Sequence, residues 1–166
     1  MLFSIVVISL LVYLWVSVCY VLFFALAAQR KSKTVKSTAT TNVKLLFMVP
    51  AYKEDAVIVE TVKNILSQPD FDLNDEVVVI ADQLKEQTIR RLKSLAINVI
   101  EVKLTKSTKA NAINAALRIL PTTYQAVVLL DADNHLVPGF IKQAKKAISE
   151  GKRVIQAHRI AKNLDT

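Results

Sequence analysis

Glycine, cysteine and histidine are scarce in this sequence of 166 residues. With only two glycines, Gly139 and Gly151, it contains neither the Gly-x-Gly-x-x-Gly loop that binds dinucleotides nor a Walker A loop. The Gly-x-Ser-x-Gly turn of serine hydrolases is also absent. The single cysteine, Cys19, excludes an internal disulfide and a cysteine-based metal site, and neither His135 nor His158 has a metal-ligand partner at helical spacing. Cations would therefore have to hold any phosphate that binds here.

No charged side chain occurs between Leu2 and Ala28. As a helix this run would be about 40 Å long, more than the ~30 Å hydrocarbon core of a membrane, and a helix satisfies its own backbone there. A cleaved signal peptide is the alternative, since residues 25–27 (Ala-Leu-Ala) resemble a cleavage site. The apolar run, however, is about twice the usual length for a signal peptide, and no basic residue precedes it. We therefore predict a transmembrane helix within residues 1–29.

Positive charge follows the apolar run. Lysine and arginine outnumber aspartate and glutamate by 22 to 14, which makes the formal net charge +8. A basic linker is predicted over residues 30–42, and its basic residues are Arg30, Lys31, Lys33 and Lys36. The positive-inside rule places the remainder on the cytoplasmic side of the cell (inner) membrane, with membrane lipids as partners of the linker. Nucleic acid is not expected as a partner, because the basic residues are interleaved with acids and lack an aromatic stacking pattern.

Apolar runs and amphipathic segments alternate over residues 43–166, which are enough for one domain. Strands are predicted at residues 43–49, 76–81, 98–102, 126–130 and 153–156. Helices are predicted at residues 55–68, 84–95, 109–120 and 138–150. This alternation predicts an α/β fold with a mostly parallel sheet and helices on both faces. In such sheets ligands bind beyond the carboxyl ends of the strands, so the residues directly after each strand are the candidates for a ligand site.

The clearest site candidate is the segment VVLLDADN, residues 127–134. Asp131 ends a buried strand and Asp133 follows two positions later. Carboxylates at this spacing can share Mg²⁺ or Mn²⁺ and leave coordination positions open for phosphate oxygens. Two loop aspartates that cap the next helix are the structural alternative.

Polar residues also follow the other strands. Pro50 is expected to end the first strand, with Glu54 and Asp55 at the start of the next helix, where plain N-capping is the alternative role. Asp82 stands directly after the second strand. Lys109 opens a helix, and because its charge opposes the helix dipole there, a purely structural role is not favoured.

Together and in this order, these segments resemble the nucleotide-binding half of the family 2 glycosyltransferases, which have the GT-A fold. The family's Pro-x-Tyr-Asn-Glu segment matches Pro50–Glu54, and the aspartate that ends its second strand matches Asp82. Its Gly-Lys-x-x-Ala-Leu-Asn segment matches Thr108–Asn114, and its Asp-x-Asp motif matches Asp131–Asp133. The resemblance covers about residues 43–163 and predicts a GT-A (Rossmann-like) domain.

The resemblance implies a nucleotide-sugar donor, with a UDP-sugar expected. The residues that it places at the donor are Pro50, Ala51, Tyr52, Glu54, Asp82, Lys109, Asp131 and Ala132. Asp82 would accept from the uracil imide, and Lys109 would lie near the diphosphate. Asp133 and Asp131 would ligate Mg²⁺ or Mn²⁺.

The implied activity is that of a membrane-anchored enzyme that transfers the sugar to a lipid-linked or polysaccharide acceptor. Lys53 and Thr108 depart from the family, which has Asn and Gly at these positions. The family's general base lies beyond the metal site, so we expect it beyond Thr166 and expect domain 43–166 to be truncated before the acceptor half. A non-catalytic donor-binding fragment is the alternative function. A haloacid-dehalogenase-type phosphohydrolase is disfavoured, because its Asp-x-Asp motif stands on the first strand.

Overall fold

The computed structural model describes residues 2–28 and 43–160. The chain divides into two compact units, Met1–Thr34 and Val35–Thr166. The basic linker predicted over residues 30–42 lies outside the described residues.

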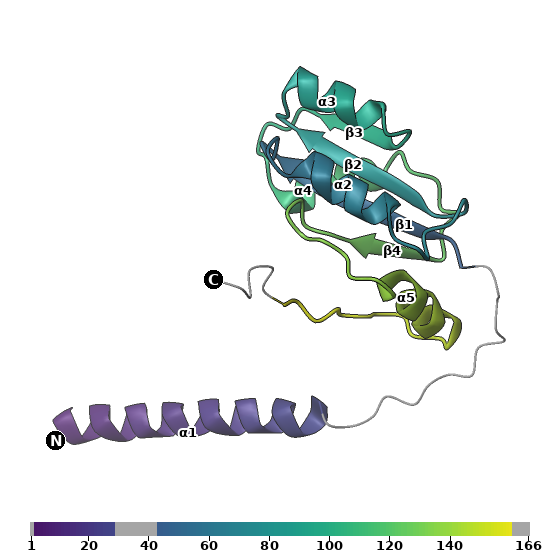
Figure 1. Ribbon diagram of the computed structural model, residues 1–166. Coiled ribbons are helices and arrows are strands. Elements are labelled where there is room, and N and C mark those ends of the chain that lie inside the picture. Colours follow the sequence, from purple (N-terminus) through teal and green to yellow (C-terminus); the bar gives the residue numbers. More distant parts are fainter. Residues whose placement is uncertain (1, 29–42, 161–166) are drawn as a thin grey trace, which may run out of the picture. The chain divides into compact units, whose positions relative to one another are not determined.

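The first unit contains one long helix, α1, which spans Leu2–Ala28 (Figure 1). Its 27 residues include no charged side chain, and those from Phe3 onward are exposed apart from the half-buried Ser17. Helix α1 is long and apolar enough to cross a membrane, although a signal sequence near the N-terminus passes the same test. The predicted helix is confirmed, and its insertion into a membrane stays a prediction.

The second unit is built on a parallel sheet of four strands in the order β3-β2-β1-β4, from top to bottom in Figure 1. The strands are β1 (Leu45–Tyr52), β2 (Glu76–Asp82), β3 (Asn98–Val102) and β4 (Ala126–Leu129). The two central strands, β1 and β2, are nearly unbroken apolar runs because both of their faces are covered. The connection from β3 to β4 returns across the sheet, so the strand order changes direction between β1 and β4.

Helices cover both faces of this sheet. They are α2 (Ile58–Leu66), α3 (Glu86–Lys93), α4 (Lys109–Leu117) and α5 (Phe140–Ser149). On one face, α2, α3 and α5 bury Val62, Leu92 and Ile141 in a cluster with alternate residues of β1. On the other face, α4 packs the small side chain of Ala112 in a cluster with Met48. The predicted α/β fold, with helices on both faces of a parallel sheet, is confirmed.

Pro50 does not end β1 as predicted, because the strand continues to Tyr52. Alternate residues of a strand direct their N–H and C=O groups to the same neighbouring strand. The carbonyl of Met48 accepts from the N–H of Leu130, so Pro50 also faces the β4 side. The ladder between β1 and β4 has already ended at Leu129, and the N–H that proline lacks therefore has no strand partner to lose. Beyond this point β1 and β4 are unpaired, which leaves space beside the end of β1.

The fifth strand predicted at residues 153–156 is wrong, because these residues are irregular in the structure. Val154 is 91% exposed and packs against no other strand. An apolar, β-branched run becomes a strand only when a neighbour pairs with its backbone groups. The helix predicted just before it starts at Phe140 instead of residue 138, since Gly139 has a φ of 84° and cannot be part of a helix.

Asp55 does not cap the helix that follows it and instead contacts the start of α3. Helix α2 begins at Ile58, three residues later than expected. The carboxylate of Asp55 instead accepts from the N–H of Lys85 at 2.8 Å and from the hydroxyl of Thr88 at 2.6 Å, at the start of α3. The hydrogen bond from Thr88 outweighs the opposing effect of burial and lowers the pKa of Asp55 below its usual range. This contact joins the loop after β1 to the loop after β2.

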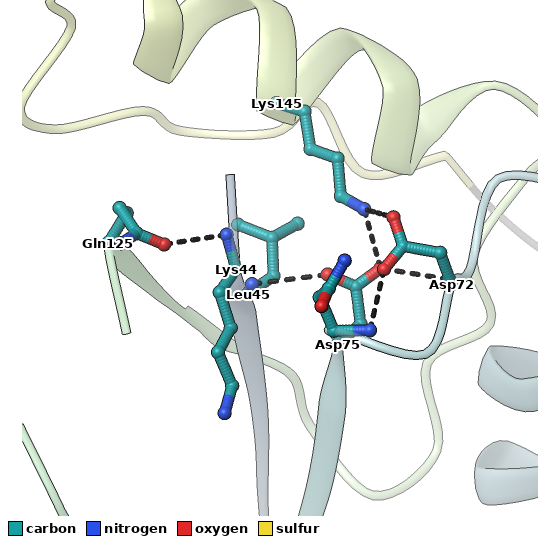
Figure 2. Close-up of polar contacts among 7 residues, drawn as sticks. Lys44, Leu45, Asp72, Asp75, Gln125 and Lys145 are labelled. Carbon is teal, nitrogen blue, oxygen red and sulfur yellow. Dashed lines mark hydrogen bonds and ion pairs between the residues drawn. The ribbon is translucent and has the colours of Figure 1, made fainter. Parts of the chain in front are cut away.

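A polar cluster holds the opposite, amino edge of the sheet together (Figure 2). Asp75, just before β2, has a fully buried carboxylate that accepts from the N–H of Leu45 at 3.1 Å. Lys145 of α5 lies 2.6 Å from a carboxylate oxygen of Asp72 and 2.7 Å from one of Asp75. Burial disfavours the charge of Lys145, but its hydrogen bonds to the two carboxylates outweigh that effect and raise its pKa. The cluster therefore ties β1, the start of β2 and α5 together.

Candidate functional site

A pocket of about 380 Å³ lies at the carboxyl edge of the sheet, beside the point where β1 and β4 separate. Its walls come from the ends of β1 and β2, the start of α4 and the loop after β4. The residues that line it are Pro50, Ala51, Tyr52, Glu54, Asp82, Ser107, Thr108, Lys109, Ala112, Asp131, Ala132 and Asp133. All nine residues predicted to contact a donor or a metal are among them. Their roles stay predictions, but the structure brings them to one place.

Asp82 stands at the end of β2, where its side chain is almost fully enclosed. The residue is 3% exposed. Within residues 43–160, its buried Oδ1 atom has no hydrogen-bond partner. A buried carboxylate oxygen without a donor is costly, and a ligand N–H that reaches it removes that cost. Asp82 is therefore a ready acceptor for a ligand in this pocket.

The backbone at the rim of the pocket is strained at two matching positions. Lys53 and Gln83 directly follow the last residues of β1 and β2, and both have a φ of 57°. Side chains other than Asn and Asp rarely adopt this left-handed conformation. The N–H of Lys53 donates to the carbonyl of Asp82 at 3.1 Å, which joins the two turns. The ammonium of Lys53 lies 5.1 Å from the centre of the Tyr52 ring and so adds positive charge at the rim.

Helix α4 directs its N-terminus into the pocket. Thr108 is the N-cap residue, and its side chain accepts from the N–H of Asn111 at 3.2 Å. Thr108 has an extended backbone with a φ of −134°, so this position does not require the glycine that the family has. The first N–H groups of the helix and the positive end of its dipole favour a bound anion at this place.

Asp131 is contacted by two cations at the mouth of the pocket. The ammonium of Lys109 contacts Oδ1, and the guanidinium of Arg159 lies 2.8 Å from Oδ2. The hydrogen bond from Lys109 is the largest influence on the carboxyl group. It outweighs burial and, with the smaller effect of Arg159, lowers the pKa of Asp131. Asp131 is therefore ionised at neutral pH and able to bind a cation.

Asp133 is exposed two residues further on and also lines the pocket. Its carboxylate makes no hydrogen bond or ion pair with any other described residue. In the part of the chain that the structure describes, no group of three or more acidic, histidine or cysteine side chains could enclose a metal. Two carboxylates, Asp131 and Asp133, nevertheless fit Mg²⁺ or Mn²⁺, since these ions often take their remaining ligands from phosphate oxygens and water.

Three residues of the pocket, Ser107, Thr108 and Ala112, were not predicted as site residues, and neither was Arg159 at its mouth. Ser107 precedes the family-like segment by one residue, and nothing in its local pattern distinguishes it. Arg159 lies 28 positions after Asp131 in a stretch without regular structure, so no periodicity relates the two. Only the fold shows that these residues meet the predicted ones.

The comparisons with solved structures agree with this fold. A mannosyltransferase from Pyrobaculum calidifontis, solved with GDP-Man and Mn²⁺, is 26% identical, with a TM-score of 0.57 over 78% of this chain and 39% of its own. Glucosyl-3-phosphoglycerate synthase from Mycobacterium tuberculosis, solved with Mn²⁺, UDP and glucosyl-3-phosphoglycerate, is 22% identical, with a TM-score of 0.51 over 66% of this chain and 41% of its own. This chain thus spans about two fifths of the length of these relatives.

A second structure of the Mycobacterium tuberculosis synthase, with Mn²⁺, UDP and phosphoglyceric acid, is 19% identical and has a TM-score of 0.51 over 72% of this chain and 45% of its own. No curated protein matches the chain. Residues 47–166 match the family described as Glycosyl transferase family 2, and this match includes every residue that lines the pocket. The chain belongs to glycosyl transferase family 2.

Proposed function

We propose that this chain carries the donor site of a membrane-anchored glycosyltransferase, which binds a nucleoside-diphosphate sugar together with Mg²⁺ or Mn²⁺. One observation carries the proposal. The nine residues predicted to bind donor and metal all line a single pocket, at the switch point where parallel sheets bind ligands. That pocket joins a buried acceptor, Asp82, to the charged pair of Lys109 and Asp131 and to the N-terminus of α4.

The base of the donor is proposed to lie against Asp82, between the ends of β1 and β2. One buried oxygen of Asp82 is unpaired among the described residues, and uracil presents one imide N–H to such an acceptor. The resemblance to family 2 glycosyltransferases supports uracil as this base and therefore a UDP-sugar as the donor. Pro50, Ala51 and Tyr52 would lie against the base and ribose, with Glu54 near the ribose.

The diphosphate is proposed to lie between the start of α4 and the loop after β4. Lys109 and the first N–H groups of α4 supply positive charge there. Asp131 and Asp133 would hold the divalent cation, with Ala132 between them against the donor. When bound, this ion neutralises negative charge that develops on the departing nucleoside diphosphate.

The acceptor is proposed to be lipid-linked or a polysaccharide, because α1 would hold the pocket close to a membrane. The positive-inside rule supports a cytoplasmic location for the domain. Topology can be tested with a thiol reagent that does not cross membranes, applied to a variant with Ser94→Cys on the exposed end of α3. The new thiol should react only after the cells are made permeable, and reaction in intact cells would overturn this orientation.

The donor site can be tested by calorimetry on the full chain in detergent micelles. UDP and GDP are titrated in the presence of Mn²⁺ and again in excess chelator. We expect UDP to bind more tightly than GDP, and to lose at least about tenfold in affinity when the metal is removed or when Asp133→Asn is introduced. Asp70→Asn is the matched control, since Asp70 lies outside the pocket. Equal UDP binding by the wild type and Asp133→Asn would contradict the assignment of Asp133 as a metal ligand. If neither UDP nor GDP binds, the donor site itself is wrong.

A further inference from the structure

Arg159 reaches the pocket from the segment after α5, whereas the residues that line the pocket all lie between Pro50 and Asp133. It follows α5 in sequence, and its guanidinium lies 2.8 Å from the Oδ2 atom of Asp131. Lys109 occupies the other oxygen of the same carboxylate. One carboxylate thus holds two cations, one from the start of α4 and one from the segment after α5.

The contact between Arg159 and Asp131 is of a kind that exchanges easily. The side chain of Arg159 is 76% exposed, and exposed ion pairs contribute about 0–1 kcal/mol because water screens them and a long side chain loses freedom. The pair is therefore a poor device for stabilising the fold. A guanidinium held loosely at the mouth of a pocket remains available to a better partner, and a diphosphate accepts two parallel N–H bonds from it.

We propose that Arg159 is a ligand of the donor's diphosphate, held on Asp131 while the pocket is empty. This inference rests on the proposed function. With donor and divalent cation bound, Asp131 would hold the cation, and the guanidinium of Arg159 would turn from Asp131 to the diphosphate oxygens.

Charge balance supports this exchange. Around Asp131 in the empty site, Lys109 and Arg159 offset the charges of Asp131 and Asp133, while the carboxylates of Glu54 and Asp82 stand elsewhere in the pocket wall. The diphosphate of a nucleotide sugar carries two negative charges and the metal carries two positive charges, so filling the site adds no net charge. Lys109 and Arg159 can then move from Asp131 to the diphosphate, because the metal replaces them at the carboxylate and no charge is left unpaired.

The exchange predicts two effects of opposite sign for one substitution. Without nucleotide, Arg159 competes with the metal for Asp131, so Arg159→Gln should strengthen the binding of Mn²⁺ alone. With nucleotide, Arg159 is a phosphate ligand, so the same change should weaken the binding of UDP at saturating Mn²⁺. If Arg159 only anchored the segment after α5, Arg159→Gln would disorder the site and would not strengthen the binding of Mn²⁺.

The experiment uses the full chain in detergent micelles at physiological ionic strength. Free Mn²⁺ is measured by electron paramagnetic resonance during titration, and UDP binding at saturating Mn²⁺ is measured by calorimetry. For Arg159→Gln we expect Mn²⁺ to bind about 3- to 5-fold more tightly and UDP about 3- to 10-fold more weakly. Arg159→Lys should recover only part of the UDP affinity that Arg159→Gln loses, because lysine keeps the charge but cannot donate the two parallel N–H bonds. Arg153→Gln is the matched control, since it removes an exposed arginine from the same segment outside this pocket.

The outcomes separate this inference from the donor site itself. If the wild type binds Mn²⁺ and UDP but Arg159→Gln changes both affinities in the same direction, or neither, Arg159 is not a diphosphate ligand. The same holds if Arg153→Gln reproduces the effects of Arg159→Gln, since the cause would then be general charge. If the wild type binds no UDP at all, the donor site fails and this inference fails with it.

Discussion

Removal of the Asp75 carboxylate should destabilise the domain more than removal of any exposed acid nearby. Asp75 has a fully buried side chain that accepts from the N–H groups of Leu45 and Asp72 and from Lys145. In Asp75→Ala the N–H of Leu45, at the buried start of β1, loses its acceptor, and an unsatisfied buried donor costs about 1–3 kcal/mol. Lys145 keeps its contact with Asp72, so the loss of its ion pair with Asp75 costs less than about 1 kcal/mol. The expected loss in the free energy of unfolding is therefore about 2–3 kcal/mol.

Thermal unfolding of the full chain in detergent micelles, followed by far-ultraviolet circular dichroism, measures this loss. For a domain of this size, 1 kcal/mol corresponds to roughly 3–6 °C, so Asp75→Ala should lower Tm by about 6–18 °C. Asp75→Asn keeps an oxygen that can accept from Leu45, and we expect it to lose about half as much stability as Asp75→Ala. Asp72→Ala is the control, because Asp72 has a side chain that is 48% exposed and should cost less than about 1 kcal/mol. Equal Tm values for Asp75→Ala and Asp72→Ala would refute the reasoning, since the buried N–H would then be unimportant.

Three further predictions concern single positions. Lys53→Asn should raise the free energy of unfolding by about 0.5–1 kcal/mol in chemical denaturation, because asparagine tolerates the left-handed backbone at this position, and a loss of stability would contradict this. Thr108→Ala should lower it by about 1 kcal/mol and Thr108→Gly by only a few tenths, as expected for an N-cap, whereas equal losses would argue against capping. Hydrogen bonds from Lys44, and to a smaller extent Tyr124, lower the pKa of Glu76. The stability that Glu76 contributes is thus present above its ordinary pKa of 4.5 and lost as the pH falls through the lowered value. Between about pH 7 and pH 3 the Tm of Glu76→Gln should therefore fall less than that of the wild type, and parallel curves would show that Glu76 contributes nothing.

Much of the fold could be predicted because it depends on short-range patterns. The apolar runs of β1 and β2 indicate strands covered on both faces, and the helical segments between them require a parallel sheet. Asp82 ends β2 and Asp131 is the second residue after β4, so the general rule for ligand sites in parallel sheets was enough to bring them together. The resemblance to a known family added Ala51, Tyr52 and Ala132, and it gave Pro50 and Lys109 their expected roles at the donor.

The remaining features depend on contacts between residues far apart in sequence. Pro50 lies inside β1 because β4 ends beside it, and no local pattern shows where a neighbouring strand ends. Asp55 contacts the start of α3 instead of capping α2, since the fold brings the loop after β1 to the loop after β2. The apolar residues 153–156 favour a strand, but strand formation requires a paired neighbour. Arg159 meets Asp131 only because the segment after α5 returns to the carboxyl edge.

The measurement that tests the central claim most directly is photolabelling of the full chain with 5-azido-UDP, with the labelled residues identified by mass spectrometry. If the pocket at the carboxyl edge binds the nucleotide, the label should fall on residues 50–54 or 82–85, should require Mn²⁺ and should disappear when excess UDP is added. A second cleft, lined by β4, α5 and residues 151–157, provides an internal comparison. Label confined to that cleft, or label on the first pocket that neither Mn²⁺ nor UDP affects, would contradict the assignment of the donor site.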